Sequence, residues 1–169
     1  MINIVLYEPE IPQNTGNIMR TCAGTGAKLH LIKPLGFSLS EHAIKRSGVN
    51  YIENCEYTTY DNWNDFLEKN PEGDFYYFTR YGKKPHSEYD YSDTTKNIYL
   101  VFGKESTGIP KEILKEHLDT CARIPTNANI RALNLSNCVA LVLFEVLRQQ
   151  DYPNLLRSEP FKGEDYLTD

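Results

Sequence analysis

The residues best suited to binding chemistry lie in a polar loop, Pro125–Asn134, which contains asparagines and Arg131. The apolar run Cys138–Phe144 follows this loop. A helix is favoured for that run, because Asn134 or Ser136 can cap its start and polar residues continue after it at helical spacing. Free backbone amides at a helix N-terminus bind carboxylates, phosphates or other hydrogen-bonding ligands. The loop is therefore a candidate ligand site, although a capped core helix would give the same pattern.

A second loop, Gly103–Pro110, comes directly after the apolar stretch Ile98–Phe102 and is bounded by glycines. Its Gly-x-x-x-x-Gly spacing is that of a phosphate-binding P-loop, but Ile109-Pro110 replaces the required Lys-Ser/Thr pair. Gly24-Thr25-Gly26 lacks the third glycine of a dinucleotide fingerprint and follows a helix rather than a strand. What remains is a glycine-bounded loop after a strand, which in an open α/β sheet lines the ligand crevice.

The chain of 169 residues has the composition of a soluble globular protein, with 40% apolar and 24% charged residues. This length predicts one domain, residues 1–169, with 151–169 as a polar surface tail. The net charge of −5 argues against a protein held to nucleic acid mainly by charge. Residues 1–50, however, carry five Lys/Arg against three Asp/Glu, which leaves room for one basic face. Five of the twelve tyrosines fall between Tyr76 and Tyr91 and suggest a surface patch.

The four cysteines, Cys22, Cys55, Cys121 and Cys138, are scattered, without a Cys-x-x-Cys pair or a partnering His. Free thiols are therefore expected, and neither a disulfide framework nor a metal site is predicted. The N-terminus lacks a signal-peptide pattern, and the longest apolar run is far too short to span a membrane. The sequence thus predicts a cytoplasmic protein without a membrane partner.

Alternating apolar and polar stretches predict an α/β protein. Strands are expected at residues 1–7, 28–32, 51–57, 75–79, 98–102 and 121–124. Helices are expected from Asn14 or Thr15 to 23, through Arg46 after the capping box Ser38–Glu41, over 61–69 and 110–116, and in the apolar run, with a loop over 80–97. This alternation predicts a mostly parallel sheet with helices on both faces. The loops after 75–79, 98–102 and 121–124 should converge on the site, with the helix start near Asn14 beside them.

Three segments together resemble the motifs of the SPOUT-class RNA 2′-O-methyltransferases, a SpoU/TrmH-like family. They are Asn14–Arg20, Leu100–Pro110, and Ile124-Pro125 through Leu133–Asn137. The short chain, the opening Tyr7–Pro12 and Arg46-Ser47-Gly48 are similar to the TrmL branch. That branch methylates the ribose 2′-hydroxyl of the wobble nucleotide, cytidine or uridine, in certain tRNAs. The resemblance covers roughly residues 2 to 153, and the combination of the three motifs makes it specific.

The resemblance implies an α/β fold with a C-terminal deep trefoil knot, a homodimer, and S-adenosylmethionine (SAM) as methyl donor. The positions that would hold SAM are Phe78, Thr79, Gly103, Glu105, Ile124, Ala132 and Leu133. The catalytic candidates are Arg20, reaching the ribose from the partner subunit, and Asn14. Supporting residues would be Ser136 and Asn137, and residues in contact with tRNA would be Lys45, Arg46 and Arg131.

Methyl transfer from a sulfonium to an alcohol is an in-line displacement, so alignment of the reactants can supply most of the catalysis. The 2′-hydroxyl is a weak nucleophile that gains from losing its proton or from stabilisation of its developing negative charge. Arg20 suits the second role, because a guanidinium keeps its positive charge at ordinary pH. The alternative role of general base, which the family resemblance also offers, would require a depressed pKa of this arginine. Glu105 would either shape its loop or face the ligand.

Two positions depart from the family pattern. Ala132 stands where serine is frequent, which removes a hydroxyl contact, and Phe144 stands where tyrosine is frequent, which removes a phenol. Two alternatives stay open beside the methyltransferase. One is an RNA- or nucleotide-binding α/β domain without methyltransferase activity, which would bind tRNA whether or not SAM is present. The other is 2′-O-methylation at a different RNA site.

Overall fold

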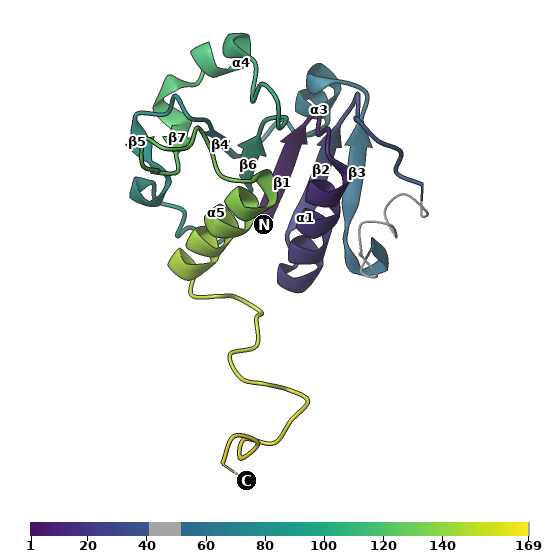
Figure 1. The fold of residues 1–169 in the computed structure, drawn as a ribbon, viewed down its shortest axis with the longest axis vertical. Coiled ribbons are helices and arrows are strands. Elements are labelled where there is room, and N and C mark those ends of the chain that lie inside the picture. Colours follow the sequence, from purple (N-terminus) through teal and green to yellow (C-terminus); the bar gives the residue numbers. More distant parts are fainter. Residues whose placement is uncertain (41–51, 169) are drawn as a thin grey trace.

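The computed structural model describes residues 1–40 and 52–168 and arranges them around one sheet (Figure 1). Its strands are β1 Ile2–Tyr7, β2 Lys28–Ile32, β3 Tyr57–Tyr60, β4 Asp74–Phe78, β5 Lys84–Pro85, β6 Ile98–Phe102 and β7 Cys121–Arg123. Its helices are α1 Pro12–Thr25, α3 Trp63–Lys69, α4 Lys111–Lys115 and α5 Leu135–Gln149. Lys45, Arg46 and the short helix expected to end there lie outside the described residues.

The described strands form a seven-stranded sheet in the order β3-β2-β1-β6-β4-β7-β5, and all neighbouring strands are parallel. In the middle of the sheet, Val5 of β1 lies between His30 of β2 and Val101 of β6. Since parallel strands end at the same edge, the loops after β1, β4, β6 and β7 meet there. The predicted parallel α/β sheet is confirmed.

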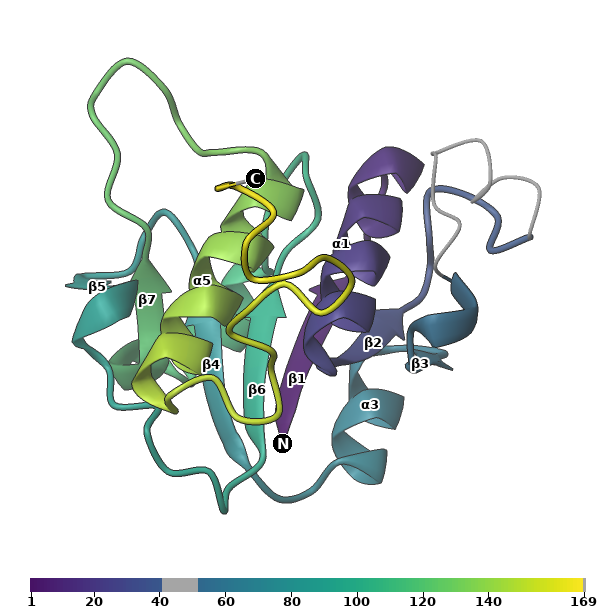
Figure 2. The same cartoon turned by 90° about the horizontal axis from the view of Figure 1, so that it is seen from below.

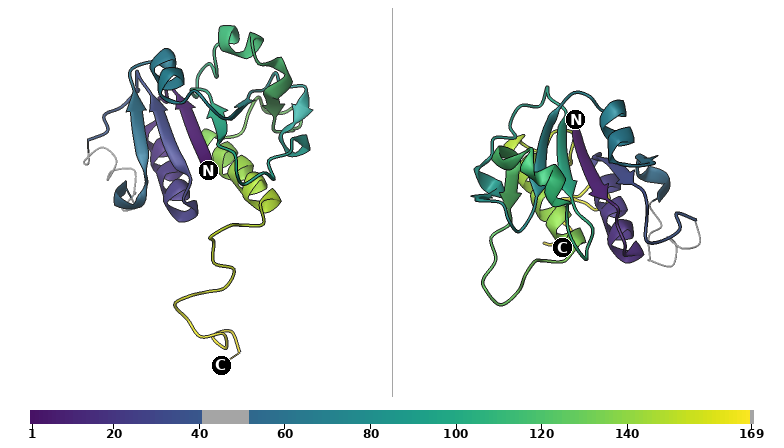
Figure 3. Two further views of the ribbon diagram at one scale, coloured as in Figure 1. Left: turned by 180° about the vertical axis from the view of Figure 1, so that it is seen from behind. Right: turned by 90° about the horizontal axis from the view of Figure 1, so that it is seen from above.

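Side chains that alternate along the inner strands fill two separate cores. On one face, Ile4 and Leu100 pack in the core that includes α1 and α5. On the other face, Val101 packs in the core that includes Phe66 of α3 and Leu114 of α4. Helices α1 and α5 lie side by side in two views (Figures 1 and 2), and from behind the strands lie in front of them (Figure 3). The predicted helices on both faces are confirmed.

Helix α1 begins earlier than the sequence predicts. Its N-cap is Ile11, which makes no side-chain capping bond, and Pro12 opens the first turn. Proline suits this position, because its ring fixes a helical φ and its missing amide would have no partner there. The predicted caps Asn14 and Thr15 are therefore wrong. Both residues lie inside the helix and are buried.

The strand expected over residues 51–57 is also wrong for residues 52–56, and residue 51 lies outside the described residues. A 3₁₀ turn occupies Ile52–Asn54, and β3 starts only at Tyr57. Within the described sheet β3 is an edge strand that pairs with β2 alone, and its first two side chains are exposed. Its sequence therefore lacks the apolar run that marks an inner strand.

The segment 80–97, expected to be a loop, contains the short strand β5 and a 3₁₀ turn at His86–Glu88. A strand of two residues is too short to show a periodic pattern in the sequence. Two of the tyrosines expected on a surface patch, Tyr77 and Tyr91, are buried in the two cores instead.

β7 lies between β4 and β5, although both of these precede it in the chain. After β7 the chain runs through residues 124–134 into α5, which packs in the same core as α1. Beyond α5 the tail leads away from the sheet (Figure 1), with Leu156 and Phe161 77% and 90% exposed. Within the described residues, no helix has the length and apolar character needed to cross a membrane.

Candidate active site

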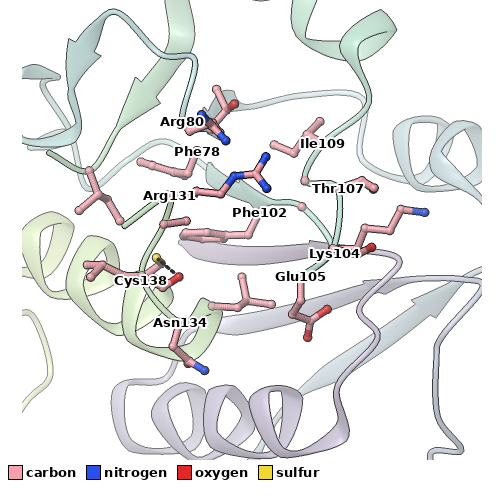
Figure 4. A pocket seen from close by; sticks show the side chains of 18 of the residues that line it. Phe78, Arg80, Phe102, Lys104, Glu105, Thr107, Ile109, Arg131, Asn134 and Cys138 are labelled. Atoms are coloured by element: carbon pink, nitrogen blue, oxygen red, sulfur yellow. Dashed lines mark hydrogen bonds between the residues drawn. The ribbon is translucent and has the colours of Figure 1, made fainter. Parts of the chain in front are cut away.

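A cavity of about 850 Å³ opens at the carboxyl ends of β4, β6 and β7. Its walls are the loops after these strands and the first turn of α1 (Figure 4). This volume lies within the range of small-molecule sites, roughly 300–1,000 Å³. The structure thus confirms that the predicted loops converge beside the start of α1.

Most residues that the sequence singles out for the site line this cavity. They are Asn14, Phe78, Thr79, Gly103, Glu105, Ile124, Arg131, Ala132 and Leu133. In the described part of the chain, Arg20 is not one of the lining residues, and it lies exposed on α1 beyond the first turn. Ser136 and Asn137 at the start of α5 also lie outside the lining. The structure therefore gathers the predicted cofactor residues but not the predicted catalytic arginine.

The loop after β6 is folded back tightly on itself. The amide of Gly108 donates to the carbonyl of Lys104 at 2.9 Å, and Gly108 has a φ of 72°. A Cβ atom on Gly103 would lie 2.1 Å from the carbonyl carbon of Gly108. A side chain at position 103 would therefore force this wall of the cavity apart.

The carboxylate of Glu105 holds the start of α1. It accepts hydrogen bonds from the amides of Glu10 at 2.8 Å and Ile11 at 3.1 Å, and from Nδ2 of Asn14 at 3.3 Å. A carboxylate is a suitable acceptor there, because the amides at a helix N-terminus lack partners within the helix. These bonds favour the loop-shaping role of Glu105 over a role in facing the ligand.

Two further interactions connect the loop after β6 to the loop after β1. The Glu10 carboxylate accepts from the amide of Ser106 at 3.1 Å and from its hydroxyl at 2.6 Å. Nζ of Lys104 pairs with Glu8 at 2.9 Å, and this hydrogen bond raises the pKa of the lysine. The loop after β1 and the loop after β6 therefore form one braced unit at the cavity.

Asn14 connects this unit to α5. Its Nδ2 donates to Glu105, and its Oδ1 accepts from Nδ2 of Asn134 at 3.0 Å. The Oδ1 atom of Asn134 caps α5, accepting from the amide of Ser136 at 2.9 Å and from its hydroxyl at 2.6 Å. Asn134 is thus one of the two predicted caps, and Ser136 braces it. This chain of bonds fixes three walls of the cavity relative to one another.

Part of the cavity lining is apolar. Phe78 and Phe102 stack with their ring centroids 4.9 Å apart. The thiol of Cys138 donates to the carbonyl of Leu133 at 3.6 Å, and burial raises its pKa. All four cysteines are free thiols, as predicted.

One polar atom in the cavity wall has no partner. The hydroxyl of Thr126 is buried and makes no hydrogen bond within the described residues. Buried hydroxyl groups are normally paired, so this atom is suited to a bound ligand with polar groups. An apolar floor and an unpaired hydroxyl fit SAM, which carries an adenine ring, a ribose and an amino-acid group.

The mouth of the cavity is cationic. Arg80, Lys104, Arg123 and Arg131 line it, and among the described residues Glu105 is the one acidic residue of the lining. Figure 4 shows Arg131 extending over the cavity and Arg80 at its rim. Arg80 and the neighbouring Tyr81 also line the cavity, although the sequence predicts a polar loop there and gives neither residue a role in the site. Both residues directly follow a strand and so lie at the carboxyl edge of the sheet, and this position is the feature of the sequence that could have identified them.

Comparison with known proteins gives the family of this chain. The model of the SpoU rRNA Methylase family matches residues 1–144. A candidate tRNA (cytidine(34)-2′-O)-methyltransferase from Listeria innocua is 52% identical over 155 residues, which cover 92% of each chain. The tRNA (cytidine(34)-2′-O)-methyltransferase of Escherichia coli K12 is 44% identical over 155 residues, covering 90% of this chain and 96% of that protein.

Solved structures agree. A candidate RNA methyltransferase from Bacillus anthracis has a TM-score of 0.90 and 49% identity, covering 94% of this chain and 100% of its own. A structure described as informing the 2-OH methylation of C/U34 on tRNA has a TM-score of 0.82 and 38% identity, covering 89% and 97%. An AdoMet-bound rRNA methyltransferase from Sinorhizobium meliloti has a TM-score of 0.76 and 25% identity, covering 87% and 56%. The resemblance carried by the three motifs is confirmed, and this chain belongs to the SpoU rRNA Methylase family.

Proposed function

We propose that this protein transfers the methyl group of SAM to the ribose 2′-hydroxyl of the wobble nucleotide, cytidine or uridine 34, in tRNA. The observation that carries the proposal is the convergence of the loops after β4, β6 and β7 with α1 on one cavity. The convergence occurs in a chain 44% identical to a tRNA (cytidine(34)-2′-O)-methyltransferase. tRNA is then the macromolecular substrate, and SAM is the methyl donor.

SAM would be held by the backbone of the three loops that line the cavity. The residues are Phe78, Thr79, Gly103, Ile124, Ala132 and Leu133, with Glu105 fixing its own loop. When bound, SAM supplies an electrophilic methyl group on a sulfonium ion. Burial keeps the Cys138 thiol neutral, and a neutral thiol is a poor nucleophile that would not compete for this methyl group. The AdoMet-bound Sinorhizobium relative supports the assignment.

The outer side of α5 supports the proposal that the protein is a homodimer. On α5, Asn137, Leu141, Phe144 and Arg148 recur at helical spacing, and Leu141 and Phe144 are 39% and 47% exposed. Large apolar side chains left exposed on one helix face mark an interaction surface. A second copy packed on this face would cover them.

Arg20 would act across that interface. It lies exposed on α1, whose first turn lines the cavity of its own subunit. From the partner subunit its planar guanidinium would orient the 2′-hydroxyl and a neighbouring phosphate, and would stabilise the developing negative charge on the oxygen. Asn14 would act beside it as a positioning residue, because both ends of its amide already hold the walls of the cavity. Arg131, together with Lys45 and Arg46, would contact the tRNA backbone.

The C-terminal part of the chain would form a deep trefoil knot. The support comes from β7, which enters the sheet between β4 and β5 after residues 79–83 have already joined those two strands. Hydrogen bonds also connect the end of α5 to the segment before β6. Gln149 bonds to the amide of Tyr91 and the carbonyl of Tyr89, and Gln150 bonds to the carbonyl of Tyr91.

Methyl transfer from labelled SAM to tRNA that lacks methylation at position 34 tests the function, with the product nucleoside identified by mass spectrometry. We expect a 2′-O-methylated nucleotide 34 from the wild type. Arg20→Ala should lose activity by on the order of 100-fold, the scale for loss of a group that stabilises transition-state charge. Arg20→Lys should also lose most activity, because the planar fork is gone. Arg157→Lys in the tail, where Arg157 pairs with Asp151, is the matched control and should turn over normally.

The outcomes separate the parts of the proposal. Near-normal turnover by Arg20→Lys would contradict the orienting role of the guanidinium. Binding of SAM by the wild type without transfer to tRNA would place the methylated nucleotide in a different RNA. Failure to bind SAM would contradict the methyltransferase activity itself.

A further inference from the structure

The turn Thr79–Gly82, which connects β4 to β5, holds an exposed aromatic ring at the mouth of the cavity. Tyr81 lines the cavity and is 72% exposed. The guanidinium carbon of Arg80 lies 5.3 Å from the centroid of its ring. Tyrosine combines a large apolar face with a polar tip and is typical of binding surfaces when it stands in water.

The turn is rigid. The amide of Gly82 donates to the carbonyl of Thr79 at 3.1 Å, and the amide of Tyr81 donates to the Thr79 hydroxyl at 3.3 Å. Nη1 of Arg123 donates to the carbonyl of Arg80 at 2.8 Å. A Cβ atom on Gly82 would lie 2.5 Å from the carbonyl carbon of Ala122, so the turn rests directly on β7. The ring is therefore presented from a fixed backbone and loses little conformational freedom on binding.

The charge around the turn is opposite to that of the whole chain. Residues 79–84 carry Arg80, Lys83 and Lys84 and no acidic residue, in a protein with a net charge of −5. Arg123 and Arg131 line the same cavity. Glu105, the acidic residue of the cavity lining, accepts three hydrogen bonds, and Glu8 pairs with Lys104. A polyanion would meet net positive charge here.

An exposed aromatic ring among arginines is the arrangement that binds single-stranded nucleic acid, in which unpaired bases stack on the ring and cations contact the phosphates. We propose that Tyr81, backed by Arg80, is a stacking platform for the unpaired base next to the target nucleotide of tRNA, with Arg80 and Arg123 facing the adjoining phosphate. This inference rests on the proposed function and extends it to the recognition of a second nucleotide. The platform would hold the anticodon loop while the target ribose enters the cavity.

An anticodon stem-loop with 2-aminopurine on one side or the other of position 34 tests the platform, because the fluorescence of this base falls when it stacks. We expect one of the two stem-loops to be quenched on binding to the wild type and to Tyr81→Phe, which keeps the ring. Tyr81→Ala should lose the quenching and bind about tenfold more weakly, within the range for loss of one base–aromatic stack. Tyr166→Ala is the matched control. Its ring is 60% exposed and lies 4.9 Å from Nζ of Lys162, but it stands in the tail.

A second variant separates stacking from charge. Arg80→Gln should reduce the slope of log Kd against log salt concentration by about 0.7, the value for one phosphate contact to a single strand. Tyr81→Ala should leave that slope unchanged. Equal quenching by the wild type and Tyr81→Ala would overturn the proposal. So would a Tyr81→Ala defect in SAM affinity alone, because the ring would then belong to the cofactor site. Binding is measured without turnover, so a wild type that binds and stacks the stem-loop but does not methylate it would contradict the proposed function and not the platform.

Discussion

The carboxylate of Glu105 accepts three hydrogen bonds, two from backbone amides at the start of α1 and one from Asn14. Glu105→Gln would remove the charge and replace one acceptor oxygen by a donor that faces these N–H groups. Hydrogen bonds to a charged group contribute about 1.5–3 kcal/mol each, so we expect the free energy of unfolding to fall by about 1–3 kcal/mol. SAM affinity should fall with it, because the loop of Gly103 loses its anchor. Urea denaturation and SAM titration by calorimetry measure the two effects.

Glu116→Gln is the matched control for Glu105→Gln, since Glu116 is exposed at the end of α4. It should match the wild type in both measurements. If Glu105→Gln also matched the wild type in SAM affinity, the bonds to α1 would have no bearing on the cavity.

At the scale of elements, the buried side chain of His30 on β2 connects three neighbouring strands of the sheet. Its Nδ1 lies 2.7 Å from the hydroxyl of Tyr60 on β3, and its Nε2 lies 2.9 Å from Oδ1 of Asn3 on β1. Burial, with a smaller effect from Lys28, lowers the pKa of His30 to about 4. The folded protein therefore keeps this imidazole neutral at a pH where the unfolded chain would protonate it.

The sign of the pH dependence follows. In the unfolded chain His30 has its ordinary pKa of 6.5 and is protonated below that pH. In the folded protein its pKa is about 4, so the imidazole stays neutral until the pH falls to about that value. Stability is therefore fully present above pH 6.5 and falls as pH drops toward 4, by roughly 3 kcal/mol at most. His30→Gln keeps a donor and an acceptor without titrating, so it should lose less stability than the wild type between pH 7 and pH 4.5. Urea midpoints at both pH values measure this, and equal losses would contradict it. Between pH 7 and 8 neither protein should change through this group.

The strength of each local signal decides which elements the sequence could predict. β1, β2, β4, β6 and β7 match their predicted positions to within a residue or so, because apolar residues predominate in each of these inner strands. β3 and β5 lie at the edges of the described sheet. β3 has exposed side chains and β5 has only two residues, so neither shows an apolar pattern in the sequence. The cap of α1 failed for a different reason. Asn14 is held by Glu105 and Asn134, which lie 91 and 120 positions away in the sequence, and no local pattern encodes such a contact.

The candidate site divides in the same way. The residues predicted to hold SAM were identified through the family resemblance, which rests on three motifs, and they line the cavity. Arg80 and Tyr81 were missed, since a turn of ordinary polar residues becomes a platform only when β7 supports it from beneath. Arg20 lies outside the lining of the cavity of its own chain, and its proposed role requires a second subunit, which no local pattern in the sequence encodes.

At the scale of the whole molecule, a partner-supplied arginine predicts that two inactive variants restore one another. Arg20→Ala lacks the arginine, and Gly103→Val forces the cavity wall apart, so each homodimer should be inactive. In a mixed dimer, the Arg20→Ala subunit contributes an intact cavity and the Gly103→Val subunit contributes Arg20. Random pairing should therefore recover about a quarter of wild-type methyl transfer, because half the dimers are mixed and each has one complete site.

Co-expression with two different affinity tags allows the mixed dimer to be purified, and this sample should show about half of wild-type methyl transfer, because one of its two sites is complete. No recovery in the purified mixed dimer would mean that Arg20 serves the cavity of its own subunit. Phe144→Lys gives the complementary readout, since a charge on the exposed face of α5 should shift the protein to a monomer in sedimentation and abolish transfer.

The place of β7 in the sheet also has a consequence for synthesis on the ribosome. β5 has β7 as its only described sheet neighbour, and β7 is made after every other strand. While the chain is being translated, β1, β2, β6 and β4 can pair, but the slot beside β4 stays open and the wall formed by residues 124–134 does not yet exist. The cavity is therefore the last part of the protein to be assembled, after the final helix has left the exit tunnel. A product of interrupted translation would carry most of the sheet and no cavity, and so would neither sequester the methyl donor nor compete for tRNA.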